Sequence, residues 1–259
     1  MTWRAMFARR GAFAQRATAA LSIAAVVFIA VALPSDPAWP AGAAYQVDTA
    51  DVSEPGACKV ESWISSAVNR DLVAAVAPAC VVNMFRPVEV SAQFDRSRAD
   101  GEWGTSVAPK LKTNLVPTGI GHFGVAVTTN AVVDLLTGDT TAWQVTVPAT
   151  LRLSNVVRIN LNAGYQRDIA AAHHYFTYGA GVDWRTPDNV WTLTAEMFGQ
   201  AGAIDDDTPR SVVRPRGQVG LRWRPIDEFN IDLIYGRNIT GENSNWVTLA
   251  TTVRFKVAP

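Results

Sequence analysis

Hydrophobic and polar residues alternate with a period of two along most of the chain after its first cysteine. Within residues 156–168, for example, Val157 and Ile159 alternate with Arg158 and Asn160. Successive side chains of a β-strand point to opposite faces, so the pattern predicts strands with one apolar and one polar face. The spacing typical of an amphipathic helix is absent from this part of the sequence.

The alternation predicts an all-β chain of about twelve antiparallel strands. Strands of soluble proteins average five or six residues, whereas about ten residues of tilted strand cross the hydrocarbon of a bilayer. The predicted strands have the longer, membrane-crossing length, and they cover residues 58–68, 72–82, 87–97, 103–114, 119–133, 141–153, 156–167, 175–185, 190–201, 213–225, 229–238 and 246–257.

The connections between these strands alternate in character. The connections after the even-numbered strands are short, whereas those after the odd-numbered strands are mostly longer and more polar. Transmembrane β-barrels have short periplasmic turns and longer extracellular loops. The pattern therefore predicts a barrel with its short turns and both termini in the periplasm.

Only two cysteines occur, Cys58 and Cys80, and they are placed symmetrically about Asn69, which lies in a predicted turn. In an antiparallel hairpin centred on this turn they face one another, so we expect a disulfide. A disulfide requires an oxidising compartment such as the bacterial periplasm. Two free buried thiols are the alternative.

The first 43 residues have the features of a secretory signal peptide. An uncharged apolar run at 17–33 precedes an A-x-A-like cleavage site at 41–43, and four arginines form the positive segment before the run: Arg4, Arg9, Arg10 and Arg16. A membrane anchor that is never cleaved is the alternative. We expect residues 44–57 to form a short periplasmic lead and residues 58–257 to form the barrel.

Two arrangements satisfy the alternation: a soluble sandwich or barrel with an apolar interior, and a membrane barrel with an apolar exterior. Trp and Tyr residues favour the second, because they lie near the ends of the predicted strands, as in the aromatic girdles of membrane barrels. This set comprises Trp103, Trp143, Tyr165, Tyr175, Trp184, Trp191, Trp223, Tyr235 and Trp246.

Charged residues lie deep within the predicted strands on the polar face. In a membrane barrel they enclose a lumen, where we expect Glu89 to meet Lys110 or Lys112, and Asp232 to lie between the strands of Arg222 and Arg254. The expected solute path comprises Glu89, Lys110, Lys112, Arg152, Arg158, Asp183, Glu196, Arg222, Asp232 and Arg254. Prolines inside the predicted strands, Pro78, Pro109, Pro148 and Pro215, predict bulges or shorter strands.

The last predicted strand, WVTLATTVRF at 246–255, resembles the carboxy-terminal signature of Gram-negative outer-membrane barrels, with Phe255 as its aromatic residue. The stretches 160–168, 177–184 and 232–246 are similar to outer-membrane transporters of a phenol-degradation pathway (MetA-like). The resemblance implies an outer-membrane location and insertion by the barrel-assembly machinery. It also implies passage of small aromatic or hydrophobic solutes, and it supplies no catalytic residues.

Other motifs do not favour an enzyme. GIGHFG at 119–124 has the glycine spacing of a dinucleotide site but precedes a strand-like segment, so we expect no cofactor. His122 has no identifiable serine partner for a lipid hydrolase. His173, His174 and the acidic loop at 205–207 do not form a recognisable metal motif.

Net charge is formally zero and gives no reason to expect nucleic acid as a partner. We therefore predict an outer-membrane barrel surrounded by lipid that passes a small solute of unknown identity. Three alternatives remain: a structural or sensory barrel that does not transport, a lipid hydrolase, and a soluble binding barrel.

Overall fold

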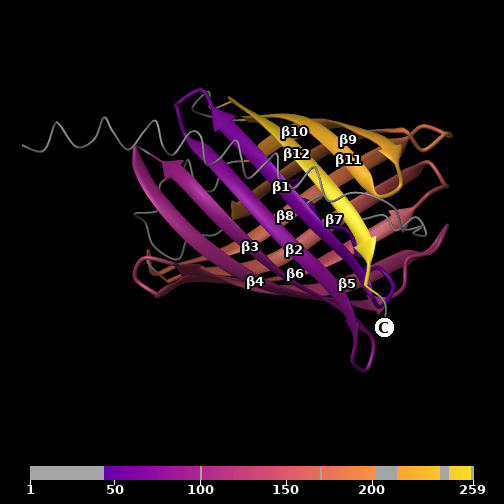
Figure 1. Cartoon of the computed structure of the whole chain (residues 1–259), viewed down its shortest axis with the longest axis horizontal. Helices are drawn as coiled ribbons and strands as arrows, with labels where there is room; N and C mark the ends of the chain where they lie inside the picture. The colour runs from indigo at the N-terminus through magenta and orange to yellow at the C-terminus, as the bar shows by residue number, and fades with distance from the viewer. Residues whose placement is uncertain (1–43, 100, 170, 202–214, 240–244, 258–259) are drawn as a thin grey trace, which may run out of the picture. The chain divides into compact units, whose positions relative to one another are not determined.

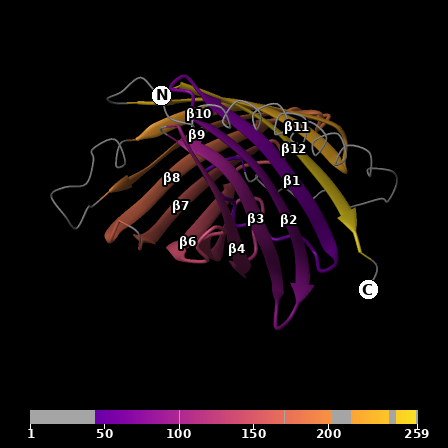
Figure 2. The same cartoon turned by 60° about the vertical axis from the view of Figure 1, so that its left-hand side comes forward.

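The computed structural model describes residues 44–99, 101–169, 171–201, 215–239 and 245–257. In these residues twelve antiparallel strands form a closed barrel in which sequence neighbours pair and β1 pairs with β12 (Figures 1 and 2). The expected signal peptide and the acidic loop at 205–207 lie outside the described residues. None of the described residues forms a helix long and apolar enough to cross a membrane.

The strands are 10 to 15 residues long, which confirms the expected membrane-crossing length. Their bounds are β1 (Ala57–Ala67), β2 (Leu72–Asn83), β3 (Pro87–Ala99), β4 (Glu102–Val116), β5 (Phe123–Asp134), β6 (Thr140–Arg152), β7 (Val157–Asp168), β8 (His173–Arg185), β9 (Trp191–Ala201), β10 (Arg216–Ile226), β11 (Phe229–Asn238) and β12 (Asn245–Lys256).

Closure of the barrel depends on the pairing of its first and last strands. The ladder runs without interruption from Ala57 opposite Lys256 to Ala67 opposite Trp246. No strand edge is left open, so the backbone groups along both strands are hydrogen-bonded, as hydrocarbon requires. We call the end that carries Ala57, Lys256 and the turn between β2 and β3 the periplasmic end.

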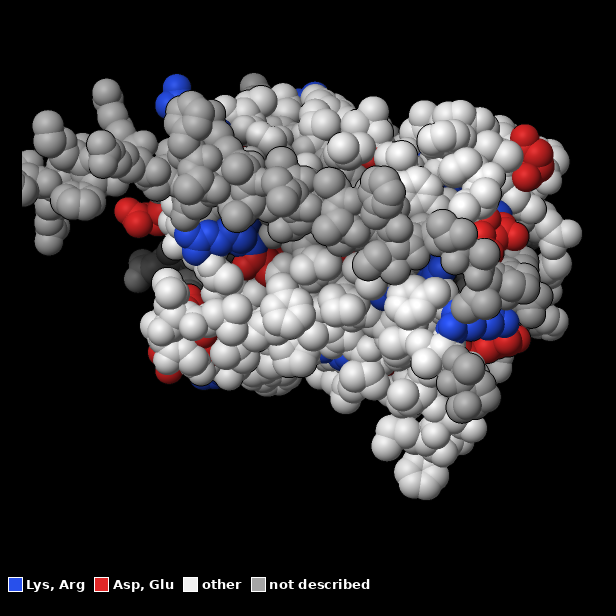
Figure 3. All heavy atoms as spheres, in the orientation of Figure 1, with Lys and Arg blue, Asp and Glu red and all other residues white. Residues whose placement is uncertain are grey.

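The apolar side chains of the strands point outward. Val219, Leu233 and Leu249 are each half exposed, while their inward-facing neighbours along the strands are buried. In Figure 3 the part of this face that is not covered by grey atoms is mostly uncharged, with the larger charged groups toward the two ends. The apolar exterior confirms the membrane-barrel arrangement over the soluble one.

Aromatic residues form belts on this exterior, with two exceptions. Seven of the nine expected side chains are exposed on the outward face: Trp103, Trp143, Tyr165, Trp184, Trp191, Trp223 and Tyr235. Trp191 and Trp223 stack with ring centroids 6.3 Å apart. Tyr175 and Trp246 were wrongly assigned to the belts, because their positions in β8 and β12 place them on the inward face.

The prolines within strands do not shift the register, which corrects the expectation of bulges. Pro78, Pro109 and Pro148 each pair normally on one side, with Val60, Ala92 and Asn162 respectively. On the other side of each, the ladder skips the proline and then resumes in the same register. Pro215 lies just before β10, so there the expected strand began too early.

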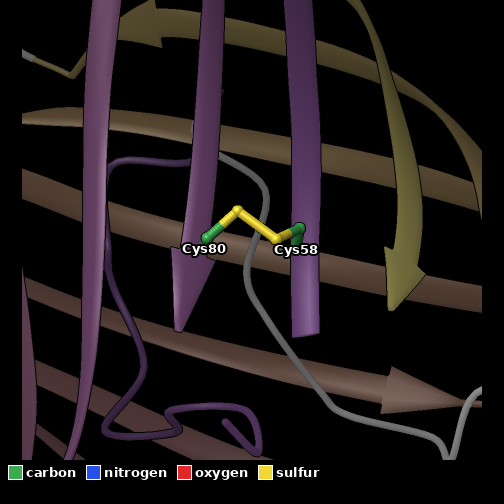
Figure 4. Close-up of a disulfide and its surroundings, with 2 residues drawn as sticks. All are labelled: Cys58 and Cys80. Carbon is green, nitrogen blue, oxygen red and sulfur yellow. A yellow bond between two sulfur atoms is a disulfide. The ribbon is translucent and has the colours of Figure 1, made fainter. Parts of the chain in front are cut away.

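The expected disulfide between Cys58 and Cys80 is confirmed (Figure 4). The two cysteines are direct partners in the β1–β2 ladder. Their neighbours Lys59 and Val81 face inward, so the bridge lies on the outward face. It joins the first two strands at the periplasmic end, where the chain enters the barrel.

Replacing both cysteines, by Cys58→Ser with Cys80→Ser, should lower the free energy of unfolding in detergent by about 3 kcal/mol, because the bridge restricts the unfolded chain. Denaturant unfolding followed by Trp fluorescence measures the effect. Cys58→Ser alone should leave a Cys80 thiol that reacts with maleimide in the folded protein. An unreactive thiol would contradict the outward placement.

Candidate functional site

The lumen is lined by charged and polar side chains from nearly every strand. The structure places all ten residues of the expected solute path on the inward face: Glu89 in β3, Lys110 and Lys112 in β4, Arg152 in β6, Arg158 in β7, Asp183 in β8, Glu196 in β9, Arg222 in β10, Asp232 in β11 and Arg254 in β12. Their role in solute passage stays a prediction.

The segment at 45–51 lies inside the lumen against these charges, and we call it the N-terminal plug. Val47, Thr49 and Ala50 are fully buried, and Tyr45 is nearly so. Residues 45–51 belong to the stretch 44–57 that was expected to form a short periplasmic lead, and they contact side chains of the lumen. The first half of that segment is held inside because it supplies hydrogen-bond donors and carboxylates that the inward charges require.

Tyr45 anchors the beginning of the plug. Its hydroxyl donates a hydrogen bond to Asp232 Oδ1 over 3.1 Å, and the Arg222 guanidinium lies 5.6 Å from the ring centroid. A Cβ atom on Gly220 would lie only 2.3 Å from the tyrosine oxygen. Glycine at this position of β10 therefore makes room for the ring to lie against the wall.

The next residues bind the wall through their backbone. The amides of Gln46 and Val47 donate to the two carboxylate oxygens of Glu196, over 3.0 and 3.4 Å. The Val47 side chain lies over Gly179 in β8, where an added Cβ would come within 2.9 Å of it. Gln218 also donates to Glu196, over 2.8 Å, so this buried side chain accepts three hydrogen bonds.

Asp48 forms the strongest contact of the plug. Its two carboxylate oxygens lie 2.9 Å from Lys110 Nζ and 2.8 Å from Lys112 Nζ. Burial acts to raise the pKa of Asp48, but the two ammonium groups outweigh burial and hold the pKa far below the usual range for aspartate. Asp48 therefore stays ionised at neutral pH.

Asp51 forms a second ionic anchor three residues later. Its Oδ2 atom lies 3.0 Å from Arg152 and 3.3 Å from Arg158. Between the two anchors, the Ala50 amide donates to Thr150 Oγ1 over 2.8 Å, and the Asn114 side chain donates to the Ala50 carbonyl. The plug is thus fixed to β4, β6 and β7 by both charge and backbone hydrogen bonds.

The wall also contains ion pairs of its own. Arg158 and Arg222 donate to Asp183 and Asp232, and the second of these pairs was expected from the order of the strands. Glu89 lies directly opposite Lys112 in the β3–β4 ladder, as expected, but the two are not at ion-pair distance. Glu89 instead lies 3.6 Å from Lys59, because Asp48 occupies both lysines of β4.

The side chains considered for chemistry lie elsewhere. His122 is exposed in the turn before β5, where its amide donates to the Gly119 carbonyl. His173 and His174 fall within β8, beside Tyr175 and Tyr165 respectively. No group of three metal-ligating side chains is found among the described residues.

Sequence reasoning missed Tyr45, Asp48 and Asp51 as functional residues. The stretch that contains them lacks alternation, so no rule of strand periodicity identifies its position. One signal was available: the acidic side chains of this stretch complement the basic residues predicted for the polar face of the later strands. Charge complementarity alone does not specify which carboxylate meets which lysine or arginine.

Comparison with known proteins identifies both a family and a fold. A family model described as "Uncharacterised conserved protein UCP029691" matches residues 29–255. No curated protein matches the chain.

Solved structures with the same barrel fold include outer-membrane porins and channels. A KdgM porin in complex with disordered oligogalacturonate has a TM-score of 0.57 and 7% identity, with 76% of this chain and 99% of that chain covered. A NanC porin has a TM-score of 0.58 and 6% identity, with 75% and 98% covered. The COG4313 outer membrane channel from Pseudomonas putida F1 has a TM-score of 0.54 and 14% identity, with 87% and 100% covered.

These likenesses, together with the apolar exterior, show that the chain has the fold of a transmembrane β-barrel. At such low sequence identity they show the fold alone.

Asp48→Asn should lower the free energy of unfolding by about 3 kcal/mol, since it leaves two lumen lysines without their counter-charge. Glu54→Gln is the matched control, because Glu54 is exposed and lies 3.8 Å from Lys256. The control should change stability by less than about 1 kcal/mol. Equal effects of the two substitutions in denaturant unfolding would show that Asp48 is not an anchor.

The lowered pKa of Asp48 also predicts a pH dependence. A carboxylate with a lowered folded-state pKa stabilises fully above its unfolded pKa, and the contribution disappears as pH falls through the folded value. The stability difference between the wild type and Asp48→Asn should therefore be constant near neutral pH. It should fall by about 1.4 kcal/mol per pH unit below about pH 4. A difference that does not change with acidity would contradict the pairing with Lys110 and Lys112.

Proposed function

The chain belongs to the family described as "Uncharacterised conserved protein UCP029691", and we propose that it is a narrow outer-membrane channel that passes a small solute passively. The observation that carries the proposal is the contrast between the two faces of the barrel. Its exterior is apolar, whereas its interior is lined by charges and hydrogen-bonding groups. A polar interior within a closed barrel is the arrangement of a channel.

The plug supports a channel that opens, because no covalent bond fixes residues 45–51 to the wall. Each contact described above is a hydrogen bond, an ion pair or a van der Waals contact. Contacts of this kind exchange with water or with a solute, so occlusion by the plug is reversible. The names of the structural neighbours, which describe porins and a channel, agree with this proposal.

The resemblance to phenol-pathway transporters favours an aromatic or hydrophobic solute. Some of the wall suits an apolar ring, since β2 presents buried alanines at 75, 77 and 79, and Trp63 lies opposite Ala75 in the ladder. These small side chains form an apolar strip beside the charged residues. Such a solute would lie against the strip and present its polar groups to the charges.

A barrel that does not transport is the second candidate, and the buried ion pairs favour it. Arg222 and Asp232 interact over 2.7 Å, with Asp232 almost fully buried. If the lumen serves only to stabilise the barrel, replacing this pair by Arg222→Gln with Asp232→Asn should lower stability without changing solute uptake. We propose no catalytic activity, because the exposed His122 has no described nucleophile within hydrogen-bond reach.

Removal of residues 45–51 should raise the single-channel conductance severalfold over that of the wild type in planar bilayers. The plug lies within the lumen, so its removal should widen the proposed conducting path. Heat-modifiable gel mobility should verify that the shortened protein is a folded barrel. Folded protein that conducts no ions, with and without the plug, would defeat the channel proposal and favour the structural one.

A further inference from the structure

The plug places two carboxylates on a basic part of the lumen wall. Asp48 lies between Lys110 and Lys112, and Asp51 contacts Arg152 and Arg158, so each carboxylate is held by two cations. The four basic residues come from β4, β6 and β7, which lie on one side of the barrel. Together they form a basic track along the lumen, which we define as Lys110, Lys112, Arg152 and Arg158.

The lumen wall carries more basic than acidic side chains in the half of the barrel that holds the plug. Asp48 and Asp51 offset part of this excess. Among the described inward residues of that half, the basic ones are Lys59, Lys110, Lys112, Arg152, Arg158, Arg185, Arg222, Arg224 and Arg254, and the acidic ones are Glu61, Glu89, Asp183, Glu196 and Asp232.

Departure of the plug has a specific electrostatic consequence. At ion-pair distance, Lys110 and Lys112 meet only Asp48 among the described residues. Buried cations that lose their counter-ion are strongly destabilised unless another anion takes its place. A solute that brings two carboxylates restores the charge-assisted hydrogen bonds, whereas a cation meets repulsion and a neutral solute brings no counter-charge for the two lysines.

The chain just after the plug is fixed to the barrel, so a displaced plug stays close to the lumen. The Gly56 amide donates to the Val81 carbonyl, and the Gly56 carbonyl accepts from the Val257 amide. These bonds and the Cys58–Cys80 disulfide fix the chain at the periplasmic end just after the plug. A displaced plug therefore stays attached beside the lumen and competes with the solute for the same cations.

We infer that the basic track binds solutes that carry at least two carboxylates, and that Asp48 and Asp51 of the plug occupy it as a built-in mimic of such a solute. This inference rests on the proposed channel for its physiological meaning, and it adds to that proposal a requirement for two carboxylates, whether or not the rest of the solute is apolar. Binding itself does not require conduction, so it is measured separately.

The test compares digalacturonate, a disaccharide with two carboxylates, with the neutral disaccharide cellobiose. In detergent, isothermal titration calorimetry should show that Asp48→Asn with Asp51→Asn binds digalacturonate at least about tenfold more tightly than the wild type does. Cellobiose should bind neither protein. Adding Lys110→Gln and Lys112→Gln to this variant should abolish the gain. Equal binding of the two sugars, or no binding of digalacturonate, would overturn the inference.

A second measurement avoids dependence on the folding of the double variant. Thr49 is fully buried in the plug, so Thr49→Cys should react slowly with maleimide in the wild-type background. Digalacturonate should accelerate the labelling severalfold by displacing the plug, and cellobiose should not. Unchanged labelling with both sugars would contradict displacement.

Bilayer recordings separate this inference from the channel proposal. In a KCl gradient, the double variant should shift the reversal potential toward anion selectivity relative to the wild type. A protein that conducts ions but shows neither anion selectivity nor digalacturonate binding would overturn the inference about the basic track. The channel proposal would still stand. Digalacturonate binding without conduction in either protein would defeat the channel and leave the binding site.

Discussion

Hydrocarbon offers no hydrogen-bond partners, so the backbone N–H and C=O groups of every strand must be hydrogen-bonded within the protein. The β1–β12 ladder meets this requirement by closing the sheet without a free edge. Closure and the alternation of side chains then divide the residues into two sets, because each strand has only one outward and one inward face. With Leu, Val and aromatic residues outside, the charged residues are necessarily enclosed.

Enclosure creates a second requirement, since a charge removed from water needs a partner. Part of the wall meets this need by itself, as Arg158 with Asp183 and Arg222 with Asp232 show. Part of the remaining basic excess is offset by the segment before β1, which lies in the lumen. Gly179 and Gly220 provide the space, because the plug's side chains lie where a Cβ atom would otherwise project.

Periodicity predicted the strands closely, and its failures have physical causes. The bounds expected for the eleventh strand agree with β11, and those expected for the twelfth differ from β12 by one residue at each end. The predicted start at 119 was too early, because Gly119 and His122 form a tight turn before β5. Trp246 lies near a strand end, as belt residues do. It nevertheless faces inward, because it is two residues from the inward-facing Thr248 in β12.

Contacts between segments that are distant in sequence were harder to predict than the inward or outward direction of a strand side chain. The contact of Arg222 with Asp232 follows from strand order, because β10 and β11 are adjacent in the sequence and in the sheet. Asp48 meets Lys110 across 62 positions of sequence, and no alternation in residues 44–57 indicates where that segment goes. A segment without regular secondary structure has no periodic sequence pattern. Its contact with an enclosed charge is therefore apparent only from the structure of the barrel.

The distribution of charge between wall and plug favours the proposed channel over a permanently closed barrel. Had the wall been self-neutralised by carboxylates on β5 or β6, the lumen would be stable without the plug and indifferent to the charge of a solute. Here part of the neutralisation resides on a segment that joins the wall covalently only through the chain that leads to β1, past Gly56 and the disulfide. If the basic track binds an anion as we infer, stability of the plugged state and affinity for the anion arise from the same lysines and arginines. The plug can therefore be strong enough to close the lumen and still be replaceable by a solute of matching charge.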